Sequence, residues 1–215
     1  MKAILIGSIG ALTETSEIQR QCFNQALAEH KTGLYWNVAN YCEMIRTPGG
    51  LSRLRNSGID DKTAKAIHDR KQQLFTNAIQ GVITPRDGIL DLLAQCHSQN
   101  IKTGFVTTTT VTTLSAIKAA LTDVIDFDKF DIITTAQDTA RAKPHPDIYH
   151  HALAHLGVAA SEALVIEDTE ANAKAAELAN ITCLLTPGEY ALAPQAAKAP
   201  LLSYDNCADM MRNAA

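Results

Sequence analysis

The 215-residue chain lacks the features that would assign it to several specialised classes of protein. No apolar run approaches the roughly 18 residues that a membrane-spanning helix needs, so we expect no membrane partner. The 19 Lys and Arg against 23 Asp and Glu give a net charge of −4. Without a basic stripe, we expect no nucleic-acid partner. The five cysteines form no Cys-x-x-Cys pair, and their odd number argues against a disulfide framework.

The N-terminus also lacks the pattern of a secretory signal, because Met1-Lys2 leads directly into a short apolar segment without a cleavage site. Most of the cysteines are expected to be small buried apolar residues. We therefore expect a cytoplasmic protein.

Five short apolar runs predict strands. They are continuous rather than alternating, which is typical of parallel strands buried on both faces. The runs are Ala3–Ile6, Thr103–Thr107, Asp131–Thr134, Ala163–Glu167 and Thr182–Leu185, and a last short strand is expected at Leu201–Tyr204. A helical pattern precedes each of the last four runs, at Gly88–Gln99, Val111–Leu121, Pro146–Leu156 and Glu170–Ala179. Alternating strands and helices predict an α/β fold around a parallel sheet with right-handed crossovers.

The segment between the first two strands contains helical patterns alone. Ser16–Glu29 begins with a Ser16…Gln19 capping box, and Asp61–Ile79 follows a plausible N-cap at Asp60. Shorter helices are expected over residues 34–57. This predicts an all-helical cap domain over residues 16–84, inserted into an α/β core made of residues 1–15 and 85–215.

Two segments near the end of the predicted core resemble motifs of haloacid-dehalogenase-type (HAD) phosphatases. They are Lys143-Pro144-x-Pro146-Asp147-Ile148-Tyr149 and Val165-Ile166-Glu167-Asp168-Thr169. The resemblance implies a HAD-like Rossmannoid core with a helical cap, in the β-phosphoglucomutase-like group. In the expected cap, Gly49-Gly50-Leu51-Ser52-Arg53 is similar to the Gly-Gly-Lys-x-Arg motif of the sugar-bisphosphate phosphatase branch, typified by xylulose-bisphosphate phosphatase.

The same resemblance implies roles for individual residues. Thr107 would hydrogen-bond a phosphoryl group, and Lys143 would neutralise it. Glu167 and Asp168 stand where the family holds Mg²⁺. Arg53 stands where a cap residue binds a distal phosphate, although Leu51 replaces the Lys beside it.

The loop after the first strand departs from the family at its two reactive positions. HAD phosphatases have Asp-x-Asp there, whereas this chain has Gly7 and Ile9, with Glu14 in place of a later Asp. A nucleophile needs a lone pair, and general acid–base help is worth roughly 10²–10⁴-fold; neither side chain supplies either. Magnesium takes oxygen ligands, of which the Ile9 carbonyl and Asp168 would remain. The sequence therefore predicts a vestigial catalytic site, with a magnesium site that is weak or absent and no other cofactor.

Neither Ser8 nor Thr107 is expected to replace the missing nucleophile. Ser8 should face away from Gly7, because successive strand side chains alternate. Thr107 has no His placed by sequence as its base. Lys143 either forms a buried ion pair with Glu167 or Asp168, which we favour, or binds an anion together with Thr107 and the backbone N–H groups of residues 7–10.

Two further signals point to chemistry that we do not favour. Gly7-Ser8-Ile9-Gly10 lacks the full glycine pattern of a dinucleotide site. His151 and His155 share a helix face at a spacing that can bind zinc, but no third ligand is fixed by sequence, so a solvated face is expected.

The sequence thus predicts a HAD-like phosphatase homologue that is inactive as a standard phosphatase. It would bind a phosphorylated metabolite, inorganic phosphate or a protein partner. The alternative is a HAD-family hydrolase of small sugar phosphates, in the manner of a phosphatase or phosphomutase, with weak or altered-mechanism activity. A third interpretation is a structural interaction protein with a vestigial pocket.

Overall fold

The structure is a computed structural model that describes residues 1–191 and 203–213. Its strands are β1 (Ala3–Ile6), β2 (Lys102–Val106), β3 (Ile132–Thr134), β4 (Ala163–Glu167) and β5 (Thr182–Leu185). Its helices are α1 (Ile9–Leu12), α2 (Ser16–Glu29), α3 (Val38–Ile45), α4 (Gly50–Asn56), α5 (Asp61–Ala78), α6 (Ile89–Ser98), α7 (Val111–Leu121), α8 (Asp147–Leu156), α9 (Glu170–Leu178) and α10 (Tyr204–Asn213). Single 3₁₀ turns lie at η1 (Phe127–Lys129) and η2 (Ala160–Glu162).

The strands form one parallel sheet in the order β3-β2-β1-β4-β5. The chain runs outward from β1 through β2 to β3, then crosses to β4 and β5 on the other side. The strand order therefore reverses between β1 and β4. Ligands of such folds bind outside the carboxyl ends of the strands at this point.

Alternating side chains of β1 enter two apolar layers. Ile4 and Ile6 belong to the layer completed by α6, α7 and α10, whereas Ala3 and Leu5 belong to the layer completed by α8 and α9. All four residues are at most 1% exposed. Burial on both faces explains why the strands appear as continuous apolar runs, and the predicted α/β fold is confirmed.

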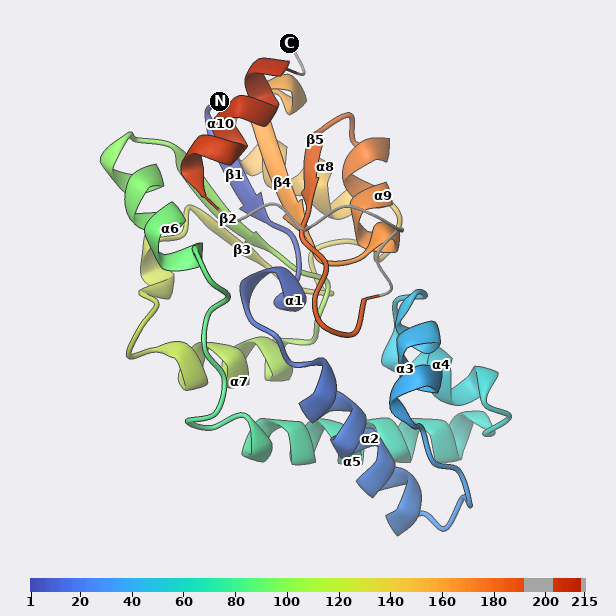
Figure 1. Cartoon of the computed structure of the whole chain (residues 1–215). Coiled ribbons are helices and arrows are strands. Elements are labelled where there is room, and N and C mark those ends of the chain that lie inside the picture. The colour runs from blue at the N-terminus through green and yellow to red at the C-terminus, as the bar shows by residue number, and fades with distance from the viewer. Residues whose placement is uncertain (192–202, 214–215) are drawn as a thin grey trace.

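Helices α2–α5, here called the helical unit, lie beyond the carboxyl ends of the strands (Figure 1). Helix α2 packs along α5. An aromatic cluster fills the interior of the unit, with ring centroids 4.8 Å apart for Phe23 and Trp36 and 6.2 Å apart for Trp36 and Tyr41. The helical unit therefore has an apolar core of its own.

Some predicted details differ from the structure. Helix α2 begins at Ser16, so Thr15 is its N-cap, and the Gln19 amide donates to Thr15 Oγ1 at 3.0 Å; the Ser16…Gln19 capping box is wrong. The sequence also gave no sign of the short helix α1. In the predicted strand Leu201–Tyr204, residues 201–202 lie outside the described residues, and Tyr204 begins α10.

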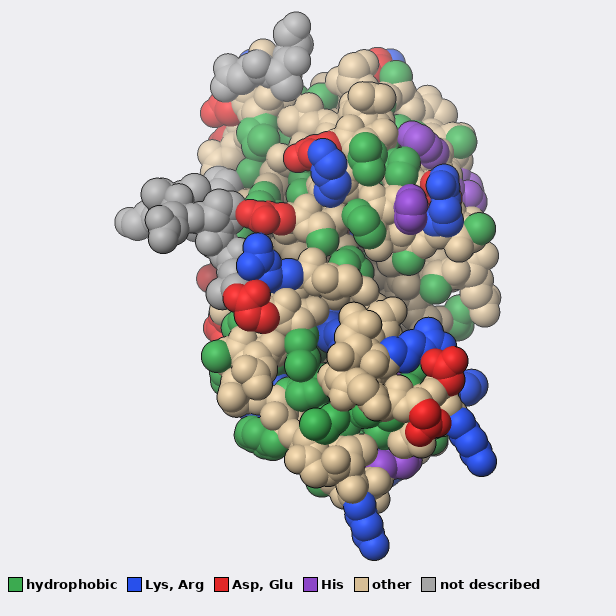
Figure 2. All heavy atoms as spheres, turned by 90° about the vertical axis from the view of Figure 1, so that its right-hand side faces the viewer, with side chains coloured by type: hydrophobic (Ala, Val, Ile, Leu, Met, Phe, Trp, Pro, Cys, Tyr) green, Lys and Arg blue, Asp and Glu red, His purple; other side chains and the backbone are tan. Residues whose placement is uncertain are grey.

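Within the described ranges, no helix combines the length and apolar character needed to cross a bilayer. Figure 2 shows one face of the molecule, on which Lys and Arg side chains are interspersed with Asp and Glu. This face carries no continuous basic stripe.

Candidate ligand-binding cleft

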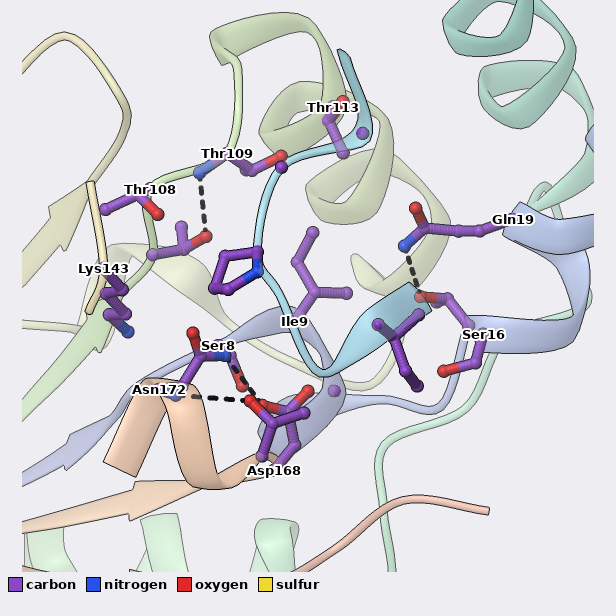
Figure 3. Close-up of a pocket in the computed structure, with 18 of the residues that line it drawn as sticks. Ser8, Ile9, Ser16, Gln19, Thr108, Thr109, Thr113, Lys143, Asp168 and Asn172 are labelled. Atoms are coloured by element: carbon purple, nitrogen blue, oxygen red, sulfur yellow. Dashed lines mark hydrogen bonds between the residues drawn. The ribbon is translucent and has the colours of Figure 1, made fainter. Parts of the chain in front are cut away.

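A cleft of about 290 Å³ lies between the carboxyl ends of the strands and the helical unit. Its sheet side is formed by the segments that follow β1, β2 and β4, including the loop 7–10 and Thr107–Thr110 (Figure 3). Its opposite side is formed by residues of α2, α4 and α5, among them Gln19, Arg53 and Lys71. The cleft therefore lies where the topology predicts a ligand site.

Gly7 follows β1, and two other side chains occupy the space that its own side chain would need. A Cβ atom at this position would collide with the Tyr149 hydroxyl and the Glu167 carboxylate. Both of these side chains are completely buried. Tyr149 donates its hydroxyl to Glu167 Oε1. The place of the missing nucleophile is thus filled by groups from α8 and β4.

Lys143 is the third member of this buried group. Its ammonium donates to Glu167 Oε1 at 2.7 Å, to the Val106 carbonyl at 2.8 Å and to the Gly7 carbonyl. An ammonium has three N–H donors, so all of them are used within the protein. Of the two alternatives for Lys143, the buried ion pair is present, with Glu167 as the partner.

Burial raises the pKa of Glu167, and Lys143 acts in the opposite direction. Burial also holds the pKa of Tyr149 well above its ordinary value, so the hydroxyl keeps the proton that it donates. Within the described part of the chain, Glu167 Oε2 has no hydrogen-bond partner. The carboxylate therefore depends on Lys143 and Tyr149.

Asp168, the next residue, faces the loop after β1. Its Oδ1 accepts from Asn172 Nδ2 at 3.0 Å, and its Oδ2 lies where a Cβ on Gly10 would collide with it. Magnesium needs a near-octahedral shell of oxygens. Because positions 7 and 9 have no side-chain oxygen and Glu167 is held by other groups, these residues do not fit a magnesium ion. No three His, Cys, Asp or Glu side chains in the described ranges gather as a metal site.

The opposite side of the cleft carries a basic cluster, which consists of Arg53, His68 and Lys71. Arg53 donates Nε to the Met44 carbonyl at 3.2 Å, and its guanidinium lies 5.7 Å from the centre of the Tyr41 ring. In the described ranges, neither Arg53 nor Lys71 has a carboxylate partner. The positive charge of the cluster is therefore not balanced by a paired carboxylate among the described residues.

Lys71 is the most buried member of the cluster, at 4% exposed. Its ammonium donates to Gln19 Oε1 at 2.9 Å and Gln72 Oε1 at 3.1 Å, and lies between the rings of Phe23 and Phe75. Burial, with Arg53 as a weaker contribution of the same sign, lowers the pKa of Lys71 to about 7. Burial, and after it the charges of Lys71, Lys65 and Arg53, lower the pKa of His68.

A family profile for haloacid dehalogenase-like hydrolases matches residues 10–186. This chain belongs to that family. Protein CbbY of Rhodobacter capsulatus is 31% identical over 197 residues, which cover 88% of this chain and 87% of that protein. Protein CbbY of Cereibacter sphaeroides is 32% identical over 197 residues, which cover 88% and 86%.

Solved structures give the same result. A crystal structure of CbbY from Rhodobacter sphaeroides in complex with phosphate has a TM-score of 0.81 at 29% identity, covering 93% of this chain and 92% of that one. A mutant of that protein in complex with xylulose-(1,5)bisphosphate has a TM-score of 0.82 at 29% identity, covering 94% and 93%. β-Phosphoglucomutase from Clostridium difficile shares the fold, with a TM-score of 0.79 at 20% identity. The predicted branch of the HAD family is confirmed.

The structure brings the sequence-predicted residues of this HAD protein to one cleft. Thr107, Lys143, Asp168 and Arg53 all line it, whereas Glu167 lies behind it in the protein interior. Their roles toward a ligand stay predictions. Thr107 is 4% exposed, and its Oγ1 accepts from the Thr109 backbone N–H at 3.1 Å. The side chains of His151 and His155 lie on the exposed face of α8, as expected.

Sequence reasoning missed Lys71 as a site residue. The signal was present, because Ile67, Lys71 and Phe75 recur every four residues along α5, and all three are buried. A Lys on the apolar stripe of a helix is unusual, since Lys is almost never fully buried without a partner. Ser8, which the sequence offers as a candidate replacement nucleophile, has a structural role instead. Its Oγ accepts from the Ala11 N–H and caps α1.

The segment after β5, residues 186–191, joins the sheet to the helical unit. Glu14 Oε2 accepts from the Glu189 N–H at 3.0 Å, and Glu14 Oε1 accepts from the Ser16 N–H at 2.7 Å. Tyr190 donates to Glu17, and its ring lies edge-on to Tyr41 at 6.2 Å. These contacts connect the sheet to the helical unit, and the cleft lies between the two.

Removing the Tyr190 hydroxyl should loosen this connection. We expect Tyr190→Phe to lower the free energy of unfolding by about 1 kcal/mol at pH 7, because the bond is made to a carboxylate. Arg20 and Tyr190 hold the pKa of Glu17 at about 2, below its ordinary 4.5, so this stability is present above pH 4.5 and is lost toward pH 2. Urea unfolding at pH 7 and at pH 2, where the folded wild type has half of its Glu17 carboxylate protonated, measures the effect; an equal difference at both would contradict it.

Proposed function

We propose that this chain binds a small phosphorylated sugar or polyol in the cleft and does not hydrolyse it. In this proposal, residues 16–84 act as the cap and residues 1–15 with 85–215 as the core. The basic cluster carries the proposal, because Lys71 is a buried cation beside a second cation. An arrangement of this kind costs stability in the free protein, and a bound dianion would relieve that cost.

Phosphate is the anion that best fits the cluster. An Arg guanidinium binds two phosphate oxygens at once, and a buried ammonium adds a compact charge. Arg53 donates its Nε to the Met44 carbonyl, and its terminal nitrogens make no hydrogen bond to the described residues. Lys71 has used two of its three N–H donors. Complexes of CbbY with phosphate and with xylulose-(1,5)bisphosphate support a phosphorylated sugar as the ligand class.

The loss of hydrolysis follows from the sheet side of the cleft. Gly7 provides no attacking atom, and Ile9 provides no acid or base. Lys143 gives its three donors to protein oxygens. We therefore propose that the protein works without a resident magnesium ion. The five cysteines are unpaired, which fits the cytoplasm as its compartment.

Weak hydrolysis by an altered mechanism is the second candidate, and the similarity to CbbY over 88% of the chain favours it. An assay with p-nitrophenyl phosphate and Mg²⁺ separates the two. We expect no turnover above the protein-free control. Turnover that is lost in Lys143→Ala or Asp168→Ala would reject the binding-only proposal.

Ligand binding is tested through the thermal stability of the protein. Ribulose 5-phosphate at about 100 times its Kd should stabilise the chain by roughly 2.7 kcal/mol, which is a rise of about 5–10 °C in Tm. Lys71→Met should abolish this rise. The same variant should itself be more stable than the wild type by about 1–3 kcal/mol at pH 6, because it removes an unpaired buried charge.

Lys65→Met is the matched control on the same helix, since Lys65 is 72% exposed and pairs with Asp69. It should change neither stability nor binding appreciably. Binding should also weaken on the order of tenfold between pH 7 and pH 9, because Lys71 loses its proton above its pKa of about 7 while phosphate stays a dianion. The absence of any rise in Tm with ribulose 5-phosphate or inorganic phosphate would leave the pocket vestigial and the protein a structural one.

A further inference from the structure

The two ends of the cleft differ in charge. At the sheet end, the Lys143 ammonium is paired with the buried Glu167 carboxylate, and the Asp168 carboxylate also lines the cleft. At the helical end, Arg53 and Lys71 stand without a carboxylate in the described lining of the cleft. The cleft is therefore positive at the helical unit and net negative at the sheet.

Among the described residues that line the sheet end, there is also no free cationic donor. Lys143 has bonded all of its N–H groups to protein oxygens, and it is 5% exposed. Asp168 reaches the loop after β1 and occupies the space next to Gly10. A phosphate placed there would meet the Asp168 carboxylate without an ammonium to offset it. The sheet end is thus a poor site for a second phosphate.

Hydroxyl groups line this end of the cleft instead. They belong to Ser8, Thr107, Thr108 and Thr109. Figure 3 labels Ser8, Thr108 and Thr109. The Thr107 hydroxyl accepts from the Thr109 N–H and keeps its own proton as a donor. Hydroxyls that both donate and accept fit the neutral hydroxyls of a sugar or polyol.

From this polarity we infer that the cleft selects a monophosphate, with its single phosphate at Arg53 and Lys71 and its neutral hydroxylated end at the sheet. The inference rests on the proposed function and deepens it. It separates this chain from the CbbY structure that holds xylulose-(1,5)bisphosphate. Here a bisphosphate gains no second cationic site, and its second phosphate faces Asp168.

Isothermal titration with ribulose 5-phosphate and ribulose 1,5-bisphosphate tests the inference, because the two sugars differ by one phosphate. The titrations are made in EDTA, so that no divalent cation bridges Asp168 and the ligand. We expect the monophosphate to bind at least as tightly as the bisphosphate. A bisphosphate that binds tenfold tighter or more would overturn the inference and leave the proposed function standing. If neither sugar binds, the proposed function fails together with the inference.

The charge of Asp168 supplies a second test. Asp168→Asn should strengthen binding of the bisphosphate several-fold and leave binding of the monophosphate within about twofold. Glu170→Gln removes a nearby exposed carboxylate that does not line this cleft, so it should change neither value. If Asp168→Asn changed the binding of both sugars equally, a phosphate of each would lie equally near Asp168, which would contradict the proposed orientation.

Discussion

Replacing Lys143 with Met is expected to lower the free energy of unfolding by about 3–5 kcal/mol at pH 8, because it leaves a buried carboxylate without its counterion. Glu167 is completely buried, and its Oε2 has no partner within the described residues. In the described part of the chain, Tyr149 would then be the one remaining donor to the Glu167 carboxylate. Urea unfolding of wild type and variant measures the loss.

The loss should shrink as the pH falls. Burial already raises the pKa of Glu167 above its ordinary 4.5, and removal of Lys143 raises it further. A carboxyl group whose pKa is higher in the folded than in the unfolded state lowers the free energy of unfolding above its unfolded pKa. This loss of stability grows with pH until the pH exceeds the folded pKa. The difference in free energy of unfolding between the Lys143→Met variant and the wild type should therefore be smaller at pH 5 than at pH 8.

Lys174→Met is the matched control, because Lys174 and Glu177 form an ion pair at 2.8 Å in which both side chains are more than half exposed. Its loss should stay below about 1 kcal/mol. A Lys143→Met variant that is no less stable than this control, or whose deficit is the same at both pH values, would show that Lys143 and Glu167 are not a buried pair.

The sequence was sufficient for the sheet because each strand is covered on both faces. The run Ala163–Glu167 is β4 residue for residue, since all five side chains are buried and no polar alternation obscures the pattern. Asn180 lies two residues beyond the end of α9 and has a positive φ of 58°, which Asn tolerates better than most residues.

The filling of the site could be predicted less well. The sequence left Glu167 and Asp168 as equal partners for Lys143, because Glu167 ends β4 and Asp168 comes directly after it. Which carboxylate turns inward depends on the space beside Gly7 and on the Tyr149 hydroxyl, which comes from another helix. The spacing of residues along the sequence shows neither the space beside Gly7 nor the contact between Tyr149 and Glu167.

Restoring the two family carboxylates, Gly7→Asp with Ile9→Asp, is expected to destabilise the protein by at least about 3 kcal/mol. The first substitution forces atoms into space that the Tyr149 hydroxyl and the Glu167 carboxylate fill, and overpacking alone costs about 1–3 kcal/mol. It also places a second carboxylate beside Glu167, where Lys143 has no N–H left to compensate it. We expect this double variant to remain without phosphatase activity.

Adding Tyr149→Phe should recover at least about 1 kcal/mol, because it removes one of the two oxygens in the way, although Tyr149→Phe alone should cost about 1 kcal/mol. Tyr149→Phe is thus expected to destabilise the wild type but to stabilise the double variant. This change of sign identifies the steric conflict, because with additive effects Tyr149→Phe would destabilise both proteins. In the triple variant, the introduced carboxylate can compete with Glu167 for Lys143. The two introduced carboxylates and Asp168 would then be oxygen ligands available to Mg²⁺, and with Mg²⁺ added we expect measurable turnover of p-nitrophenyl phosphate. A double variant as stable as the wild type would instead mean that the space beside Gly7 is empty.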